Sequence, residues 1–292
     1  MLSTRFDGAI GARVEGVDLA ALDDELFGEI HRKFLDHSVL VFPDQKLSPA
    51  EMVEFSRRFG KLIVHPLVEY NHPDQEEIFV LSNVVVDGKP KGLDDGGSYW
   101  HSDYSYKAVP ALATILYGVE IPERGGDTLF VDMYRAYETL GHDTKTEIEG
   151  LKARHWLTLG GADTALEFLP PGVAKPANSE RKARLDPEFV AANPPTGHPI
   201  VRVHPETGRK ALFVHPSYTH EVVGMSDTDG KSLLRRLFAH STQPEFQIRH
   251  RWSANDLVVW DNRCTMHAAT TSGLPKTERR TVYRTSVDAP VF

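Results

Sequence analysis

The sequence is poor in cysteine and in long apolar runs. Cys264 is the single cysteine among 292 residues, so the chain can neither close an intramolecular disulfide nor supply a thiolate cluster for zinc or iron–sulfur. The longest apolar runs, such as SVLVF, are far shorter than the ~20 residues of a membrane span. The first ten residues also lack the apolar stretch of a signal peptide. These absences predict a cytoplasmic protein with no membrane partner.

Positive charge is also scarce. The chain has 33 Lys and Arg against 41 Asp and Glu, a formal net charge of −8, so no basic excess is present to neutralise a phosphate backbone. We therefore expect no nucleic-acid partner. The 40% hydrophobic and 25% charged residues lie at the globular average, which argues against a disordered, collagenous or coiled-coil chain.

The pattern along the chain indicates a β-rich fold that begins with helices. Residues 13–19 alternate like a strand, residues 24–37 carry apolar positions at helical spacing, residues 38–45 read as a strand, and Ser48 begins a second helix. From residue 78 onward, short strand-like runs alternate with turns. The high frequency of short strands and turns predicts a mainly β protein with outer helices (α+β), built as a sandwich or jelly roll.

A proline-rich stretch interrupts the β-rich part. Residues 169–199 contain seven of the 19 prolines, and irregular segments of this length inside a domain are usually lids or binding loops. We predict a single domain over residues 1–292 with a lid or insertion at about 160–199. A tolerated surface insertion is the alternative.

The histidines of the sequence indicate where a catalytic or metal site could lie. With 14 histidines and 41 acidic residues, chance predicts about two H-x-[DE] patterns, and three occur: His72/Asp74, His101/Asp103 and His204/Glu206. The first and third contain proline at the middle position and are typical of turns. SYWHSDYSY, in contrast, is aromatic and favours a strand, on which residues two apart face the same side. The sequence therefore predicts that His101 and Asp103 converge.

A histidine and a carboxylate on one strand, joined by a second histidine, form the 2-His-1-carboxylate triad of non-haem Fe(II) sites. His267 is the best-placed third member, because it lies on the strand that returns from the apolar run DLVVWDN. From spacing alone it could equally be a structural histidine of the core.

Two arginines follow in ERRTVYRTSV. The strand period places Arg280 and Arg284 on one face, where two guanidinium groups repel each other unless they meet anions. Arg280 could hold a dicarboxylate and Arg284 a second anion. The alternatives are a solvated face of an edge strand, or a pairing of Arg284 with a nearby acid such as Asp288.

Five ordered motifs then carry a resemblance to a known family. They are Trp100-His101-Ser102-Asp103, Gly125-Gly126-Asp127-Thr128, the run FQIRHRW, Val259-Trp260-Asp261-Asn262-Arg263, and His267 followed by Arg279-Arg280. Together they resemble the TauD/TfdA (taurine dioxygenase) family of Fe(II)/2-oxoglutarate-dependent dioxygenases. The resemblance implies a double-stranded β-helix (jelly roll) core with helices outside it, and we also expect a homo-oligomer.

The resemblance implies roles for five residues around the metal and the cosubstrate. His101, Asp103 and His267 would be the catalytic iron ligands, and Thr128 and Arg280 would bind 2-oxoglutarate. The expected cofactors are Fe(II), 2-oxoglutarate as cosubstrate, and O₂. Asp103 argues against the related halogenases, which carry a small residue in place of the carboxylate ligand.

Three further residues would contact the substrate. Arg284 matches an arginine that binds the acidic group of the substrate, His65 matches a histidine that contacts the sulfonate in taurine dioxygenase, and Tyr104 lies beside the iron motif. Val68 and Gly97 stand where taurine dioxygenase has tyrosine and asparagine, which disfavours taurine itself.

We therefore expect hydroxylation of a C–H bond in a small anionic substrate, coupled to decarboxylation of 2-oxoglutarate to succinate and CO₂. The substrate could be a sulfonate, an aryloxyalkanoate or an amino-acid-derived carboxylate. An isonitrile-forming or other oxidative-decarboxylation member of the family, and an inactive jelly-roll binding module, stay open as alternatives.

Overall fold

The computed structural model describes residues 1–8, 10–94, 96–157, 163–173 and 187–289. Its helices are α1 (Asp24–His37), α2 (Pro49–Arg57), α3 (Met133–Glu138), α4 (His142–Ile148), α5 (Asp163–Glu167), α6 (Pro187–Ala192) and α7 (Asp227–Ser241). The chain is mainly β with some helices, as predicted. Among the described residues, no helix combines the length and apolar character needed to cross a membrane.

The largest sheet has eight strands in the order β1-β2-β3-β16-β8-β18-β5-β4. These strands are β1 (Leu2–Arg5), β2 (Ala12–Glu15), β3 (Val39–Phe42), β16 (Leu257–Asp261), β8 (Ala113–Glu120), β18 (Thr281–Val287), β5 (Gln75–Ser82) and β4 (Asn71–His72). All pairings between them are antiparallel except that of β2 with β3. A second, three-stranded sheet has the order β15-β9-β17, with β15 (Gln247–His250), β9 (Thr128–Asp132) and β17 (Thr265–Ala269).

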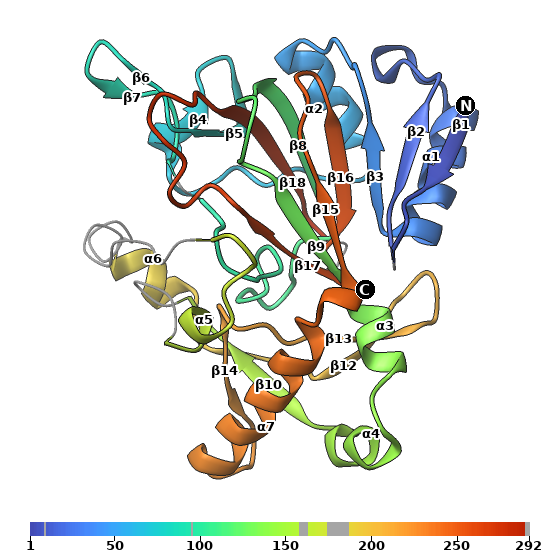
Figure 1. The fold of residues 1–292 in the computed structure, drawn as a ribbon, viewed down its shortest axis with the longest axis vertical. Helices are drawn as coiled ribbons and strands as arrows, with labels where there is room; N and C mark the ends of the chain where they lie inside the picture. The colour runs from blue at the N-terminus through green and yellow to red at the C-terminus, as the bar shows by residue number, and fades with distance from the viewer. Residues whose placement is uncertain (9, 95, 158–162, 174–186, 290–292) are drawn as a thin grey trace.

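Alternating side chains of the large sheet build two separate cores. On β3, Leu40 packs with helices α1 and α2 on the outer side of the sheet, whereas Val41 belongs to an inner core. That inner core also contains Trp260 from the large sheet and Phe130 from the small sheet. The two sheets therefore face each other across a shared core, and α1 and α2 cover the outside (Figure 1).

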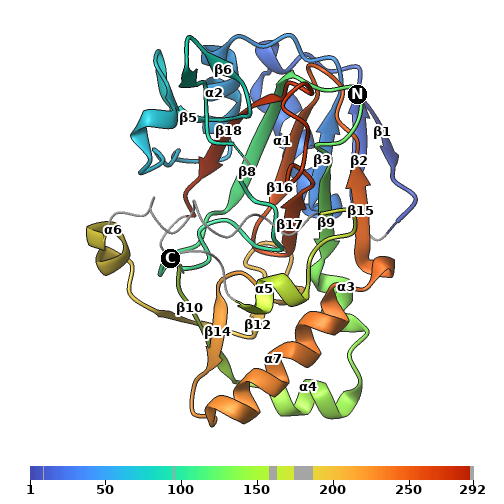
Figure 2. The ribbon, with the colours of Figure 1, turned by 60° about the vertical axis from the view of Figure 1, so that its left-hand side comes forward.

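The small sheet is covered on its other side. Leu129 and Val131 of β9 join a third core with Leu237 and Phe238 of α7. Around this core lie β10 (Lys152–His155), β11 (Thr196–Pro199), β14 (Thr219–Val222), and the pair β12 (Val201–Val203) and β13 (Lys210–Leu212). Figure 2 shows α3, α4 and α7 together at this end of the molecule. A short hairpin of β6 (Val85–Val86) and β7 (Lys89–Pro90) projects at the opposite end.

The predicted beginning of the fold is confirmed. A strand, a helix, a strand and a second helix occur as β2, α1, β3 and α2. Ser48 forms the expected capping box, since its hydroxyl accepts from the Glu51 backbone N–H and the Glu51 carboxylate accepts from the Ser48 backbone N–H.

One expectation about a strand was wrong, and one alternative about another strand is excluded. SYWHSDYSY is not a strand: it forms successive turns, and Tyr104 has a φ of 54°, which strands do not contain. β18 is not an edge strand, because it pairs with β5 on one side and β8 on the other. Arg280 immediately precedes β18, and a bulge follows between Thr281 and Val282.

The lid or insertion predicted at about 160–199 lies partly outside the described residues, at 160–162 and 174–186. Within it, the structure describes α5, α6 and β11, together with residues 168–173 and 193–195. The prediction of a lid or insertion therefore stays a prediction.

Candidate metal and substrate site

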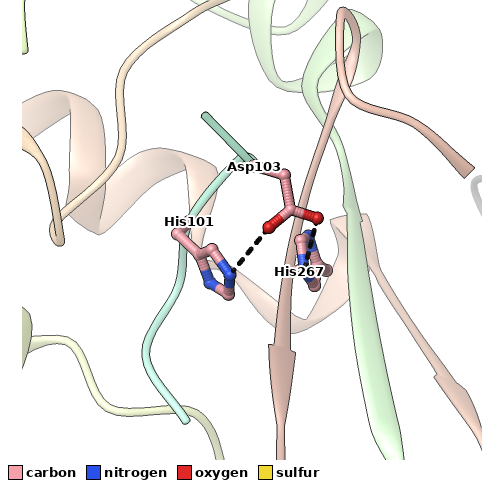
Figure 3. Close-up of side chains that lie close together, drawn as sticks. All are labelled: His101, Asp103 and His267. Carbon is pink, nitrogen blue, oxygen red and sulfur yellow. Dashed lines mark ion pairs between the residues drawn. The ribbon is translucent and has the colours of Figure 1, made fainter. Parts of the chain in front are cut away.

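His101 and Asp103 come together with His267, which lies on a segment far away in the sequence. His267 is on β17, and its backbone exchanges two hydrogen bonds with that of His101 in an isolated β-bridge. The three side chains are buried, and their candidate ligand atoms lie within 4.8 Å of one another. Asp103 Oδ1 is 3.6 Å from His101 Nε2, and Asp103 Oδ2 is 3.7 Å from His267 Nε2 (Figure 3).

The protonation states suit metal binding. His101 Nδ1 lies 2.7 Å from the carbonyl oxygen of Tyr99, so this nitrogen carries the proton and leaves the lone pair on Nε2. Burial holds the pKa of His267 well below its usual value, and the imidazole is neutral. Burial alone would raise the pKa of Asp103, yet the charge of Arg284 holds it well below its usual range. Two imidazoles and one carboxylate fit the donor set of non-haem Fe(II).

The loop that precedes β9 brings a glycine against Arg280. Gly126 has a φ of 70°, and a Cβ at this position would lie 2.8 Å from Cδ of Arg280, so only glycine fits there. The Gly126 carbonyl accepts a hydrogen bond of 3.1 Å from Arg280 Nε. Burial lowers the pKa of Arg280 to about 10, which still leaves it charged at neutral pH.

Thr128 lies at the start of β9, two residues after Gly126. Its hydroxyl is buried and accepts a hydrogen bond of 3.0 Å from the indole N–H of Trp252, so its own proton is free to point elsewhere. Arg280 also lines a small hollow together with Leu81, Asn83, Leu93 and Thr271.

Arg284 is a close neighbour of Asp103. Its Nη1 is 3.7 Å from Asp103 Oδ1, and its guanidinium carbon lies 5.1 Å from the ring centre of Phe79 and 6.0 Å from that of Tyr104. The alternative pairing with Asp288 is not observed. Arg284 Nε is buried and has no hydrogen-bond partner among the described residues.

His65 joins the same surroundings. Its ring centre is 3.8 Å from that of Phe79 and 6.4 Å from that of Tyr104, and its Nδ1 accepts a hydrogen bond from the Leu67 backbone. Burial, assisted by the charge of Arg284, lowers the pKa of His65 to about 2, so the imidazole is neutral. The structure thus brings together the three residues predicted to contact substrate.

Sequence reasoning missed two further tyrosines near the metal ligands. Tyr106 is buried, and Tyr218 packs edge-on against it at 5.6 Å and against His101 at 6.1 Å between ring centres. With Tyr104, they form an aromatic group that we call the tyrosine wall. Tyr106 lay in a run the sequence singled out as aromatic, whereas Tyr218 follows a turn and carried no signal.

Val68 and Gly97, the two departures from taurine dioxygenase, have different surroundings. Val68 is 67% exposed, so it contributes little to a buried pocket. Gly97 has a φ of 83°, and a Cβ there would lie 3.2 Å from Cε1 of His101.

The other two H-x-[DE] histidines lie apart from this site. His72 is at the sheet edge and its ring accepts a backbone hydrogen bond from Asp74, as a turn residue would. His204 is also in a turn, but it is fully buried with Nε2 3.0 Å from Asp261 Oδ2. Asp261 and Cys264 lie close enough to His204 to resemble a metal group, yet Arg263 already binds both Asp261 oxygens.

The comparisons with known proteins agree with this geometry. The model of the family described as "Taurine catabolism dioxygenase TauD, TfdA family" matches residues 3–286. The chain is 36% identical over 272 residues to the alpha-ketoglutarate-dependent 2,4-dichlorophenoxyacetate dioxygenase of Cupriavidus pinatubonensis, which covers 88% of this chain and 87% of that protein. It is 34% identical to the pentalenolactone F synthase of Streptomyces arenae, over 88% of this chain and 84% of that protein. The solved structure of AAD-2 in complex with Mn(II) and N-oxalylglycine has a TM-score of 0.80 and 29% identity, and covers 99% of each chain.

Proposed function

Because the chain belongs to the TauD/TfdA family, it is an Fe(II)/2-oxoglutarate-dependent dioxygenase, and we propose that His101, Asp103 and His267 hold its iron. The observation that carries this proposal is the convergence of the buried His101 and Asp103 side chains with that of His267 from a distant strand. Three ligands on one side leave positions for cosubstrate and O₂. The bound metal, with 2-oxoglutarate and O₂, supplies the oxidising chemistry that breaks a C–H bond.

We propose that Arg280 and Thr128 bind the carboxylate of 2-oxoglutarate that lies away from the metal. Arg280 is a buried cation that forms no ion pair with a carboxylate among the described residues, and Gly126 fixes its Nε through the backbone carbonyl. Trp252 occupies one lone pair of the Thr128 hydroxyl and thereby directs its proton toward another acceptor. The hollow beside Arg280 supports this location.

We propose that Arg284 binds the acidic group of the prime substrate, with His65 and Tyr104 beside it. The free Nε of Arg284 is a donor for an incoming anion, and the neutral His65 adds no competing negative charge. The tyrosine wall and Phe79 offer an apolar, aromatic surface against which the body of a substrate can pack. The preferred substrate is therefore a small anion with an aromatic or apolar body, such as an aryloxyalkanoate, whose C–H bond next to the anionic group is hydroxylated.

We also propose the finer features of the fold and setting. The eight-stranded and three-stranded sheets that face each other would be the two sheets of a double-stranded β-helix (jelly roll) in one domain over 1–292. A homo-oligomer in the cytoplasm, without nucleic-acid or membrane partners, is proposed on the resemblance, the net charge and the single cysteine. Nothing favours an isonitrile-forming reaction or an inactive binding module.

A substrate panel tests the proposal. Purified protein with Fe(II), 2-oxoglutarate and O₂ is given 2,4-dichlorophenoxyacetate, taurine, an alkyl sulfate and an N-carboxymethyl amino acid, and succinate release is measured. We expect the aryloxy acid to stimulate succinate release far more than taurine. Equal stimulation by taurine would overturn the proposed substrate class, and no succinate with any compound would contradict the proposed roles of the site residues.

A further inference from the structure

A buried chain of hydrogen bonds reaches Asp103 from Asn262, a residue of the Val259–Arg263 motif, through Thr114, which belongs to none of the motifs. The Thr114 hydroxyl donates a hydrogen bond of 2.6 Å to Asp103 Oδ2, and Asn262 Nδ2 donates one of 3.0 Å to the Thr114 oxygen. Thr114 and Asn262 are fully buried. Thr114 comes from β8, whereas Asn262 lies in the turn between β16 and β17, so two elements far apart in sequence meet at this carboxylate.

The donor and the acceptor of each hydrogen bond between Asn262, Thr114 and Asp103 can be assigned. Asn262 Oδ1 accepts from two fixed donors, the Trp260 indole N–H at 3.0 Å and the Asp103 backbone N–H at 3.2 Å. Its amide nitrogen must therefore face Thr114. The ionised Asp103 carboxylate can only accept, so the single Thr114 hydroxyl proton points to Oδ2.

These hydrogen bonds also oppose a competing orientation of the Asp103 carboxylate. Arg284 approaches Oδ1 of the same carboxylate at 3.7 Å, a loose ion pair that would draw the carboxylate away from the histidines if nothing else held it. The Thr114 hydroxyl fixes the rotation of the carboxylate so that Oδ1 faces His101 and Oδ2 faces His267.

We propose that Thr114 and Asn262 are positioning residues that set the orientation of Asp103 for metal binding. This inference rests on the proposed metal site. Hydrogen bonds from residues around a metal ligand typically change metal affinity by roughly 10–100-fold. Thr114 acts directly on Oδ2, and Asn262 acts through Thr114 and through the backbone of Asp103.

Titration of metal-free protein with Co(II), followed by the ligand-field absorption of the bound ion, tests this proposal. Thr114→Val removes the hydroxyl at nearly constant volume, and we expect Co(II) affinity to fall by about 10–100-fold with a changed absorption spectrum. Thr114→Ser keeps the hydroxyl and should stay within about 3-fold of the wild type, by the same argument. If Thr114→Val does not fold, Thr114→Ala removes the same hydroxyl without branching.

Thr285→Val is the matched control. Thr285 is also a fully buried strand threonine, but its hydroxyl bonds to Ser56 at 2.7 Å on the outer side of the sheet. We expect this variant to lose thermal stability comparably while keeping Co(II) affinity. Wild-type affinity in Thr114→Val, or an equal loss in Thr285→Val, would overturn the proposal.

His101→Ala distinguishes a failure of the proposed metal site from a failure of the proposed positioning role of Thr114. If His101→Ala binds Co(II) normally, the proposed metal site is wrong. If it loses Co(II) binding while Thr114→Val does not, the metal site stands and the positioning role of Thr114 is wrong.

Discussion

Arg284 and Asp103 lie 3.7 Å apart, Nη1 to Oδ1, and 15% and 6% of their side-chain surfaces are exposed. One arginine thus touches the proposed metal carboxylate and borders the tyrosine wall where the substrate is expected to bind. The contact explains why the Asp103 carboxylate stays ionised despite its burial. It also means that substrate recognition and metal binding meet at a single side chain.

Arg284→Ala should separate substrate response from cosubstrate binding. We expect 2-oxoglutarate affinity and the slow decarboxylation without substrate to persist, while the stimulation of succinate release by an aryloxy acid is lost. Arg284→Lys should recover part of it, because an ammonium cannot form two parallel hydrogen bonds to a carboxylate. If the alanine variant loses cosubstrate binding and substrate response equally, the strand has been damaged generally and the anion-binding role must be dropped.

Arg280→Ala should weaken 2-oxoglutarate binding. Loss of a buried charge-assisted contact costs about 2–5 kcal/mol, so the dissociation constant should rise roughly 30-fold or more. Arg279→Ala is the matched control, since Arg279 is the preceding residue but is exposed and paired with Glu120. Calorimetry with anaerobic protein checks both variants, and unchanged affinity in Arg280→Ala would show that the cosubstrate lies elsewhere.

His267→Ala should abolish turnover and leave folding nearly intact, because His267 lies on a strand that the surrounding sheet already holds in place. His72→Ala provides the comparison: its ring makes only a local turn contact at the sheet edge, and activity should stay near the wild type. Succinate release and circular dichroism measure the two properties. Retained iron-dependent turnover in His267→Ala would remove His267 from the ligand set.

His204→Ala should act on stability. His204 is fully buried against Asp261, which Arg263 continues to bind, so we expect a loss of about 1–3 kcal/mol in the free energy of unfolding. The His204→Ala protein that is folded should keep the Co(II) affinity of the wild type. Urea denaturation measures the loss, and an unchanged midpoint would mean that the pair contributes nothing.

Buried histidines predict a fall in stability at acidic pH. The ring centres of His198 and His215 lie 5.2 Å and 5.3 Å from that of His155. Burial lowers the pKa of all three histidines, that of His198 to about 4. Since the unfolded value is about 6.5, the unfolded chain binds protons first. Stability is therefore full above pH 6.5 and declines as pH falls toward 4, by about 2–3 kcal/mol from His198 alone.

His198→Gln tests this pH dependence, because glutamine can keep a hydrogen bond to the Lys107 carbonyl but does not titrate. Denaturation midpoints at several values between pH 8 and 4.5 should fall less steeply in this variant than in the wild type. His142→Gln, at an exposed position of α4, should reproduce the wild-type slope. Equal slopes in all three proteins would exclude His198 as a source of the effect.

The sequence predicted which residues meet better than how they meet. His101 and Asp103 were expected to converge through the alternation of a strand, but His101 forms only an isolated β-bridge and Asp103 lies in a turn with Tyr104 at positive φ. The β-propensity of the aromatic residues was overridden by long-range contacts, namely the bridge to His267 and the hydrogen bond from the Asp103 backbone to Asn262.

The opening helices were predictable because their signals are local. The capping box at Ser48 and the spacing of apolar residues in α1 depend on neighbours within a few positions. Thr114 carried no such signal: an isolated threonine in an apolar strand acquires its role only when residues from distant segments meet it.

The most direct test of the central claim is an anaerobic titration of the protein with Fe(II) and 2-oxoglutarate, followed by visible absorption. The account predicts a metal-to-cosubstrate charge-transfer band that saturates at one iron per chain and is absent in His267→Ala. No band in the wild-type protein, or a band of the same intensity in His267→Ala, would contradict the metal site assigned to His101, Asp103 and His267.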